Sequence, residues 1–499
     1  MALLDQPEAA DFLRAPYERQ VALIRDPANE PALRALLGGA GYEEFRASAA
    51  EIDLTAHLGA HLASGPKSVI FVPGIMGSLL TSKNQGGMWW IDVRMAAYID
   101  RLALTPDGEH DADQEDIAIE PFNTDISYAP LRSAIVRQGL GHDAFPYDWR
   151  KPLRCSTAAL RDAVVRLHEA QTNGRKIDIV AHSMGGLLVR DTLAEFGDVL
   201  RPLVGRIVFI ATPHYGSPAI AGYLKNHLWG FELIELLGWF LSPRTLRTMW
   251  GALSLLPAPS GTYPGTRERD RHPWKSTARD AYAHPAVNFD LYDVDAWGLE
   301  LLSEERDRLR DILVAVAQLH RQRYDAHRRL PQEFRDKMLN IVGVGYRSLF
   351  RLDFPHGIRV LWSETAKTTS RVRGDPHREG DGTVPLASAE LENVETRYVR
   401  GKHAALPNLD VVYRDVFTWL SGGTPNLLAR TAQGALEAHL GPTGDDPTPH
   451  LSGTSMAGCA GSDDSGRWNE TPVSPARLDE LKAELAGGTL TDFTRVRLL

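Results

Sequence analysis

The chain has 499 residues, of which 43% are hydrophobic, and a formal net charge of −9. This length suits one large α/β domain with insertions, or two domains, and a core of that size needs no disulfide or metal for its stability. The mildly negative charge argues against a protein that binds nucleic acid.

The first segment, residues 1–65, has the apolar spacing of amphipathic helices and no strand signal, so we expect a helical N-terminal extension. Its first ten residues hold neither a basic stretch nor a long apolar run. The most apolar segment, residues 228–241, is too short to cross a bilayer and contains two glutamates. We therefore expect no signal peptide and no membrane span. This predicts a cytoplasmic protein, with signal-independent export as the alternative.

The two cysteines, Cys155 and Cys459, are expected to be free thiols. Cys459 lies in a glycine- and serine-rich stretch, where a stable disulfide is not expected, and free thiols favour a reducing compartment.

Strands alternate with helices after residue 66. Buried strands are predicted at 68–72, 144–147, 177–180 and 206–211, and helices at 157–171 and 184–196. Further strands are predicted at 339–344, 359–362 and 395–399, before a closing helix at 406–420. This alternation predicts a mostly parallel, doubly wound sheet, whose two halves are residues 66–215 and 336–422.

The alternation is interrupted by residues 216–335, which hold no convincing strand. A long helix with one apolar face is predicted over 303–328, and we interpret the whole insertion as a helical cap or lid. Residues 423–499 are rich in Gly, Ser, Thr, Pro and Asp, which predicts a flexible tail with a last short helix near 476–486.

The strongest functional signal lies in the segment Lys176–Arg190. The β-branched run Ile177–Val180 leads into a serine that has a small residue two positions before it and glycine two positions after it, and a helical pattern begins at once. This context is typical of a nucleophile elbow, in which a sharp turn holds a serine hydroxyl above the end of a sheet. Here Ala181 replaces the usual glycine. We therefore predict an α/β-hydrolase fold with Ser183 as its nucleophile.

A serine hydroxyl needs a general base, and the base needs an orienting carboxylate. In α/β-hydrolases the acid and then the base follow the serine along the chain. Asp381 lies in a turn with two glycines, and His403 directly follows the last predicted strand. We predict these two as acid and base, with His214 and His356 as weaker candidates for the base. His182 is interpreted as a packing residue.

Two backbone amides must stabilise the oxyanion of the tetrahedral intermediate. One is predicted at Met184, the first residue after the serine. The other is predicted in the loop after the first strand, at Ile75, with Met76 as the second choice.

Two aromatic segments allow more than one interpretation. Asp148 and Arg150 flank a tryptophan, and we favour a buried ion pair beneath the active site over direct substrate contact. Trp89 and Trp90 fit core packing and substrate contact equally well.

Five segments, in chain order, resemble the signature blocks of the lecithin:cholesterol acyltransferase family. They are Val72–Leu80, Phe145–Arg150, Ala181–Gly186, Ala211–Ser217 and Gly380–Val384, and the resemblance spans roughly residues 66–420. It implies an α/β-hydrolase that opens an acyl ester through a covalent acyl-serine. It also implies Ser183 as nucleophile, Asp381 as acid and His403 as base, and a loop containing Met88–Asp92 near the acyl or membrane-facing entrance. The secreted members of that family have signal peptides and disulfides, and we expect neither in this chain.

The apolar cap suggests a long acyl chain as substrate. We expect an acyl pocket lined by large apolar side chains: Met76, Trp89, Trp90, Trp229, Phe231, Trp239 and Phe240. The cap would also allow transient contact with a membrane surface. Because no metal-ligand spacing, P-loop or dinucleotide fingerprint is found, we expect neither a metal nor a cofactor.

The sequence therefore predicts a serine esterase or lipase that cleaves acyl esters. One alternative is an acyltransferase on the same machinery, which passes the acyl group to an alcohol. A second is a non-catalytic lipid-binding protein on a hydrolase core, and a third is a protease or amidase.

Overall fold

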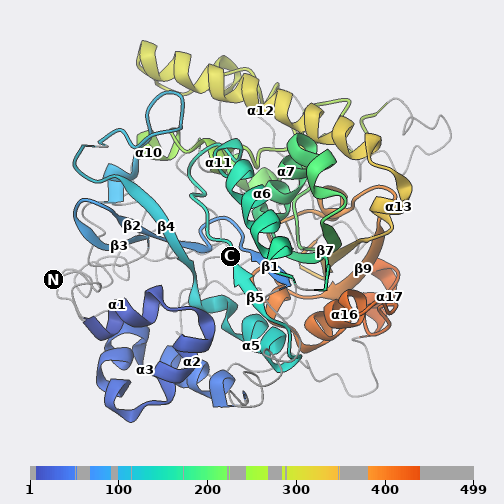
Figure 1. The fold of residues 1–499 in the computed structure, drawn as a ribbon. Coiled ribbons are helices and arrows are strands. Elements are labelled where there is room, and N and C mark those ends of the chain that lie inside the picture. Colours follow the sequence, from blue (N-terminus) through green and yellow to red (C-terminus); the bar gives the residue numbers. More distant parts are fainter. Residues whose placement is uncertain are drawn as a thin grey trace.

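A six-stranded parallel sheet forms the centre of the computed structural model, in the order β5–β1–β6–β7–β8–β9 (Figure 1). Its strands are β1 (Val69–Val72), β5 (His142–Ala144), β6 (Ile177–His182), β7 (Val204–Ile210), β8 (Met338–Val344) and β9 (Glu395–Arg400). The structure describes residues 7–50, 52, 68–90, 99–113, 115–171, 173–221, 224, 243–267, 284–286, 289–346, 348 and 380–438.

Helices cover both faces of this sheet. Helices α6 (Arg154–Glu169) and α7 (Met184–Leu200) lie on one face, and α5 (Ala129–Arg137) and α16 (Asp410–Leu420) lie on the other (Figure 1). Successive residues of β6 point to opposite faces, so Ile179 packs in the core beneath α6 and α7, and Val180 packs beneath α5 and α16. A parallel sheet buried on both faces, with a sharp turn after β6, confirms the predicted α/β-hydrolase fold.

Most predicted core elements agree with the structure to within a few residues, but one strand is wrong. The strand predicted over 144–147 ends at Ala144, because Pro146 has no amide hydrogen for a sheet ladder. The predicted helix 406–420 is divided into a 3₁₀ turn at Leu406–Asn408 and α16. The strand predicted at 359–362 and the helix predicted near 476–486 lie outside the described residues.

A second, three-stranded antiparallel sheet was not predicted. It has the order β3–β2–β4, formed by β3 (Gly86–Trp90), β2 (Ser78–Ser82) and β4 (Ile119–Thr124). The loop expected at Met88–Asp92 is therefore wrong in its first part, because these residues belong to β3 as far as Trp90. Ile91 and Asp92 lie outside the described residues.

Three helices precede the sheet and pack against it. They are α1 (Pro7–Arg14), α2 (Tyr17–Arg25) and α3 (Glu30–Ala50), in the segment expected to be a helical extension. Their apolar side chains share one cluster with Leu79 and Met88 of the small sheet and with Val136 of α5. The Tyr17 hydroxyl also donates to the Ala129 carbonyl of α5, at 3.1 Å. This N-terminal unit is thus joined to the helix that flanks the first strands.

The insertion after β7 contains helices and, among its described residues, no strand. It includes α10 (Pro243–Leu246), α11 (Trp250–Leu253), α12 (Ser303–Arg329) and α13 (Gln332–Arg335), and α12 runs as a long rod across the molecule (Figure 1). Trp229, Phe231, Trp239 and Phe240, predicted to line an acyl pocket, lie outside the described residues. In the described part of the chain, no helix has the length and apolar character needed to cross a bilayer.

The first part of the segment predicted to be a flexible tail packs against the core. Residues 423–438 are ordered against the core, and they include α17 (Ala432–Glu437) and a bridge between Ala429 and Tyr398 of β9. The buried carboxylate of Asp415 accepts hydrogen bonds from the amides of three successive residues, 426–428. The sequence boundary at 423 was therefore wrong, because a hydrogen-bonded turn is not visible in residue composition.

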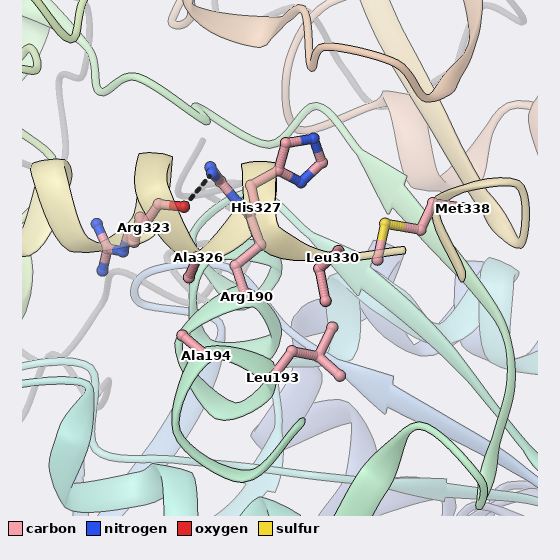
Figure 2. A pocket seen from close by; sticks show the side chains of 8 residues that line it. All are labelled: Arg190, Leu193, Ala194, Arg323, Ala326, His327, Leu330 and Met338. Atoms are coloured by element: carbon pink, nitrogen blue, oxygen red, sulfur yellow. Dashed lines mark hydrogen bonds between the residues drawn. The ribbon is translucent and has the colours of Figure 1, made fainter. Parts of the chain in front are cut away.

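Helix α12 is fixed to α7 by a buried ion pair. The Arg323 guanidinium makes two hydrogen bonds to the Asp191 carboxylate, at 2.6 and 2.7 Å. Figure 2 shows a second link, in which Arg190 of α7 donates to the Arg323 carbonyl at 3.3 Å. The cavity in Figure 2, between α7, α12 and β8, has a volume of about 20 Å³. That is room for about one water molecule and not for an acyl chain.

Replacing Asp191 by Ala should destabilise the protein by about 3–5 kcal/mol, because Arg323 would remain buried without its partner. Asp198→Ala, on the same helix, is the matched control, since the Asp198 side chain is 94% exposed in its pair with Arg201. Urea unfolding of both variants measures the difference. Equal unfolding midpoints would show that this ion pair does not hold the cap helix.

Candidate active site

Ser183 occupies a strained turn between β6 and α7. Its backbone has φ 50° and ψ −126°, a conformation that non-glycine residues rarely adopt. The Ser183 amide donates to the Ile210 carbonyl of β7 at 2.8 Å, which ties the turn to the neighbouring strand. A nucleophile elbow at Ser183 was the sequence prediction, and the turn has the expected geometry.

The glycines after the serine are required by the close approach of neighbouring chain segments. A Cβ atom at Gly185 would lie 2.4 Å from the Pro73 carbonyl oxygen, and one at Gly186 would lie 2.1 Å from the Thr212 hydroxyl. Both distances are shorter than any real Cβ contact. The elbow therefore lies directly against the loop after β1 and the loop after β7.

The His403 ring lies between the Ser183 hydroxyl and the Asp381 carboxylate. Its Nε2 atom is 2.9 Å from Ser183 Oγ, and its Nδ1 atom is 2.7 Å from Asp381 Oδ2. A carboxylate only accepts hydrogen bonds, so Nδ1 carries the proton, and Nε2 is free to accept the proton of the serine hydroxyl. All three side chains are at most 3% exposed. The three residues predicted from sequence are thus brought together in the order that nucleophilic catalysis requires.

The position of Asp381 is fixed by its own turn. Its Oδ1 atom accepts hydrogen bonds from the amides of Thr383 and Val384, at 3.0 and 2.7 Å, which leaves Oδ2 for His403. Gly380 has φ 120°, and a Cβ atom there would lie 2.1 Å from the Val384 carbonyl oxygen. The His403 amide also donates to the Asp381 carbonyl at 2.9 Å. Backbone and side-chain hydrogen bonds together fix the position of Asp381 relative to His403.

The loop after β1, residues 73–77, lies beside the serine: a Cβ atom at Gly74 would be 3.0 Å from Ser183 Cβ. Side chains and amides from several segments hold the loop in place. The bonds run from Tyr147 Oη to the Pro73 carbonyl, from the Gly74 amide to Tyr128 Oη, from Trp90 Nε1 to the Met76 carbonyl and from the Asp125 amide to the Gly77 carbonyl. Their lengths are 2.9–3.1 Å.

The two predicted oxyanion donors lie on this loop and at the first position of α7. Within the described residues, neither the Ile75 amide nor the Met184 amide donates a hydrogen bond, although both residues are buried. The amide of Met184, the first residue of α7, has no partner within its helix. Both amides are therefore available to a ligand oxygen beside Ser183.

The tryptophans predicted to line an acyl pocket are core residues. Trp89 and Trp90 are each 1% exposed, and Trp90 packs edge-on against Trp149 with ring centroids 4.9 Å apart. Met76, the third described residue of the predicted pocket, is buried in the same core cluster and has φ 61°. Of the two interpretations of these tryptophans, core packing agrees with their surroundings in the structure.

Asp148 and Arg150 form a buried ion pair, the interpretation that the sequence analysis favoured. Arg150 Nε and Nη2 donate to the two Asp148 carboxylate oxygens, at 2.9 and 2.6 Å. Asp111, which the sequence analysis missed, lies 2.8 Å from Arg150 Nη2. Burial lowers the pKa of Arg150, but the two carboxylates more than offset this, so the net shift is upward. Asp111 could not be found from sequence, because it lies on a loop far from the motif.

His214, one of the alternative candidates for the base, is hydrogen-bonded elsewhere. His214 Nε2 is 3.2 Å from Asn340 Oδ1, and its pKa is held well below the ordinary value by burial and then by Arg190. His356 lies outside the described residues. His182 packs against the His403 ring, as expected of a packing residue, and also makes two hydrogen bonds that sequence reasoning missed.

Among the described residues, no group of three or more His, Cys, Asp or Glu side chains is arranged to hold a metal ion. Cys155 is a free, exposed thiol, and Cys459 lies outside the described residues.

Comparison with known proteins supports the family resemblance. Residues 127–228 match the model of the lecithin:cholesterol acyltransferase family. This range includes the blocks that begin at Phe145, Ala181 and Ala211, and leaves out those at Val72 and Gly380. The resemblance predicted from the signature blocks is thereby confirmed for the central part of the chain.

An uncharacterized protein of Saccharomyces cerevisiae, YJR098C, is 25% identical over 255 residues. The match covers 48% of this chain and 35% of the yeast protein, so the chain spans about a third of that relative's length. Two solved structures are similar at 15% identity. A complex of Tle4 with Tli4 has a TM-score of 0.40 and covers 72% of this chain and 97% of the other. The mature lipase BlEst2 of Bacillus licheniformis has a TM-score of 0.34 and covers 71% and 92%.

The two adjacent tryptophans provide a matched test of the loop. Trp90→Phe removes the hydrogen bond to the Met76 carbonyl, whereas Trp89→Phe removes a bond to Gly86 within the β3 hairpin. Since small displacements of catalytic donors are costly, we expect Trp90→Phe to lower kcat on an aryl ester by about tenfold, and Trp89→Phe to change it little. Steady-state kinetics at matched folded fraction measures this. An equal loss in both variants would indicate a general packing defect.

Proposed function

We propose that this lecithin:cholesterol acyltransferase-like chain is a serine hydrolase, which cleaves carboxylic esters through an acyl-serine intermediate. The proposal rests on one observation, the hydrogen-bonded chain from Asp381 through His403 to Ser183. The unpartnered amides of Ile75 and Met184 support it, because they lie on the two segments that meet at the serine.

In the first half of the reaction, His403 Nε2 takes the proton of Ser183 as Oγ attacks the ester carbonyl. The negative oxygen of the tetrahedral intermediate accepts hydrogen bonds from Ile75 and Met184. Asp381 stabilises the protonated imidazole and keeps the ring in place. His403 then gives its proton to the leaving alcohol, and the acyl group stays on the serine.

In the second half, His403 takes a proton from an incoming hydroxyl, whose oxygen attacks the acyl-serine carbonyl. The bond between the carbonyl carbon and Ser183 Oγ then breaks, and His403 returns the proton to Oγ. Water gives hydrolysis, and an alcohol gives acyl transfer. The outcome depends on how well water is excluded from the acyl-enzyme. We favour hydrolysis and keep acyl transfer as the alternative, because the family resemblance covers both.

For the substrate we propose a lipid acyl ester. The support comes from the family match and from the apolar sequence of residues 228–241 in the cap. A non-catalytic lipid-binding protein is a weaker alternative, because such a protein has no need for a strained serine held on a buried histidine and aspartate.

Ser183→Ala should lower hydrolysis of a short aryl ester by at least about 10³-fold and leave the unfolding temperature within a few degrees of wild type. His403→Ala and Asp381→Ala should be similarly damaging, and combining either with Ser183→Ala should add little, because the three act as a unit. A fluorophosphonate probe, which reacts with an activated serine, should label wild type and not Ser183→Ala. Labelling of a different serine would show that Ser183 is not the nucleophile.

Acyl chain length tests the substrate class. If a long chain is bound in an apolar pocket, kcat/KM should rise from two-carbon esters to longer ones until the pocket is full, because each buried methylene contributes about 0.8 kcal/mol. A series from two to sixteen carbons, with and without a long-chain alcohol acceptor, measures both substrate preference and transfer. A profile that peaks at acetate and falls steadily would point to a small-ester or amide hydrolase.

A further inference from the structure

The hydroxyl of Tyr128 connects two segments of the candidate active site. Tyr128 ends the 3₁₀ turn Ile126–Tyr128 that leads into α5, and it is buried. Its hydroxyl accepts a hydrogen bond from the Gly74 amide, in the loop after β1, at 3.0 Å. The same hydroxyl is 2.8 Å from Nδ1 of His182, the residue before the serine.

His182 continues the connection to the base. Its Nε2 atom is 3.2 Å from the backbone carbonyl oxygen of His403. A carbonyl only accepts, so the hydrogen of His182 is on Nε2. Burial, and then the neighbouring His403, hold the pKa of His182 well below its ordinary value, so the ring is neutral and Nδ1 is an acceptor. Tyr128 therefore donates to Nδ1 and accepts from the Gly74 amide, so every donor in the series has a defined acceptor.

We propose that Tyr128 and His182 are positioning residues, which hold the oxyanion loop, the nucleophile elbow and the base loop in one hydrogen-bonded series. The inference rests on the function proposed above. Neither side chain exchanges a proton with the substrate. They act by fixing Gly74, next to the predicted donor Ile75, and the backbone of His403.

The packing around Tyr128 supports a role for the hydroxyl beyond filling space. A Cβ atom at Gly74 would lie 3.4 Å from this oxygen, and one at Gly77 would lie 2.9 Å from it. The first distance is an ordinary contact, whereas the second is too short, so glycine at position 77 lets the loop approach the hydroxyl. The ring itself packs against Phe71, with centroids 4.8 Å apart, and phenylalanine would retain that contact.

Tyr128→Phe tests the hydroxyl directly. It leaves the Gly74 amide and His182 Nδ1 without partners, so we expect kcat on an aryl ester to fall by about 10- to 100-fold, with KM changed less than about twofold. The rate of fluorophosphonate labelling should fall in parallel, because that reaction also uses the base and the oxyanion donors. Tyr292→Phe is the control, since it removes a tyrosine hydroxyl that donates to the Pro257 carbonyl in the cap.

Three substitutions at His182 separate the two halves of the series. In His182→Gln the amide nitrogen reaches the Nε2 position and keeps a donor to the His403 carbonyl. In His182→Asn the amide oxygen takes the Nδ1 position and keeps an acceptor for Tyr128. His182→Leu keeps neither. We expect Gln and Asn each to retain more kcat than Leu at equal folded fraction. Tyr128→Phe should cost less in His182→Leu than in wild type, because only the bond to the Gly74 amide is then left to lose.

The results separate this inference from the proposed function. If the probe labels Ser183 at the same rate in wild type and in Tyr128→Phe, the positioning role is overturned and the hydrolase assignment stays intact. The same conclusion follows if Gln, Asn and Leu at His182 lose kcat equally, or if Tyr292→Phe loses as much as Tyr128→Phe. Wild type that is not labelled at Ser183 would overturn the proposed function itself.

Discussion

The close approach of two backbone segments is the constraint on which the candidate site depends. The end of β1 passes so near the first turn of α7 that any side chain at position 185 would collide with the carbonyl oxygens of Val72 and Pro73. This contact sets the loop after β1 beside the serine, and the surrounding hydrogen bonds then fix it from several sides. Tyr147, Trp90 and Tyr128 come from three different segments, yet each donates to or accepts from a backbone atom of that one loop. These three aromatic side chains thus hold a backbone conformation as well as bury apolar surface.

The parts of this arrangement that local chemistry dictates could be predicted from the sequence. The elbow at Ser183 is visible because a strand, a small residue, two glycines and a helix follow one another without interruption. Asp381 and His403 are visible because the order of the three residues along the chain is a property of the fold.

The small antiparallel sheet could not be predicted, since its strands are short and mix polar and apolar residues on a surface buried by the N-terminal helices. Asp111 and Tyr128 were missed for a related reason, because their importance lies in partners distant along the chain. Trp89 and Trp90 were open to two interpretations, because an aromatic pair has the same pattern in a core as at an entrance.

Buried charges are handled in two different ways in this molecule. Arg150 and Arg323 are each paired with carboxylates, and these pairs join segments that no hydrophobic pattern would bring together. Arg132 and Arg190 are buried without a carboxylate in hydrogen-bonding contact among the described residues, and burial lowers the pKa of each to about 10. Arg132 instead lies 4.6 Å from the centre of the Tyr17 ring, and Arg190 donates to the His214 and Arg323 carbonyls. Both remain charged at neutral pH, since hydrogen bonds and ring contact replace part of the lost hydration. Arg132 thus lies where the N-terminal unit meets the central fold, and Arg190 and Arg323 lie where the cap helix meets it. Arg150 instead joins the segment after β5 to the loop that contains Asp111.

The distance along the chain between the members of the candidate triad has a consequence for biosynthesis. Ser183 and His403 are 220 residues apart, and the acid joins only 22 residues before the base. A growing chain therefore exposes its elbow serine long before a partner exists that could remove the hydroxyl proton. β8 and β9, which place the acid and base turns, form one edge of the central sheet. An emerging or truncated polypeptide consequently carries an inert serine, and reactivity arises only when the last strand has been added. Esterase activity would then report on completed folding of the whole central sheet, more strictly than any spectroscopic measure of its helices.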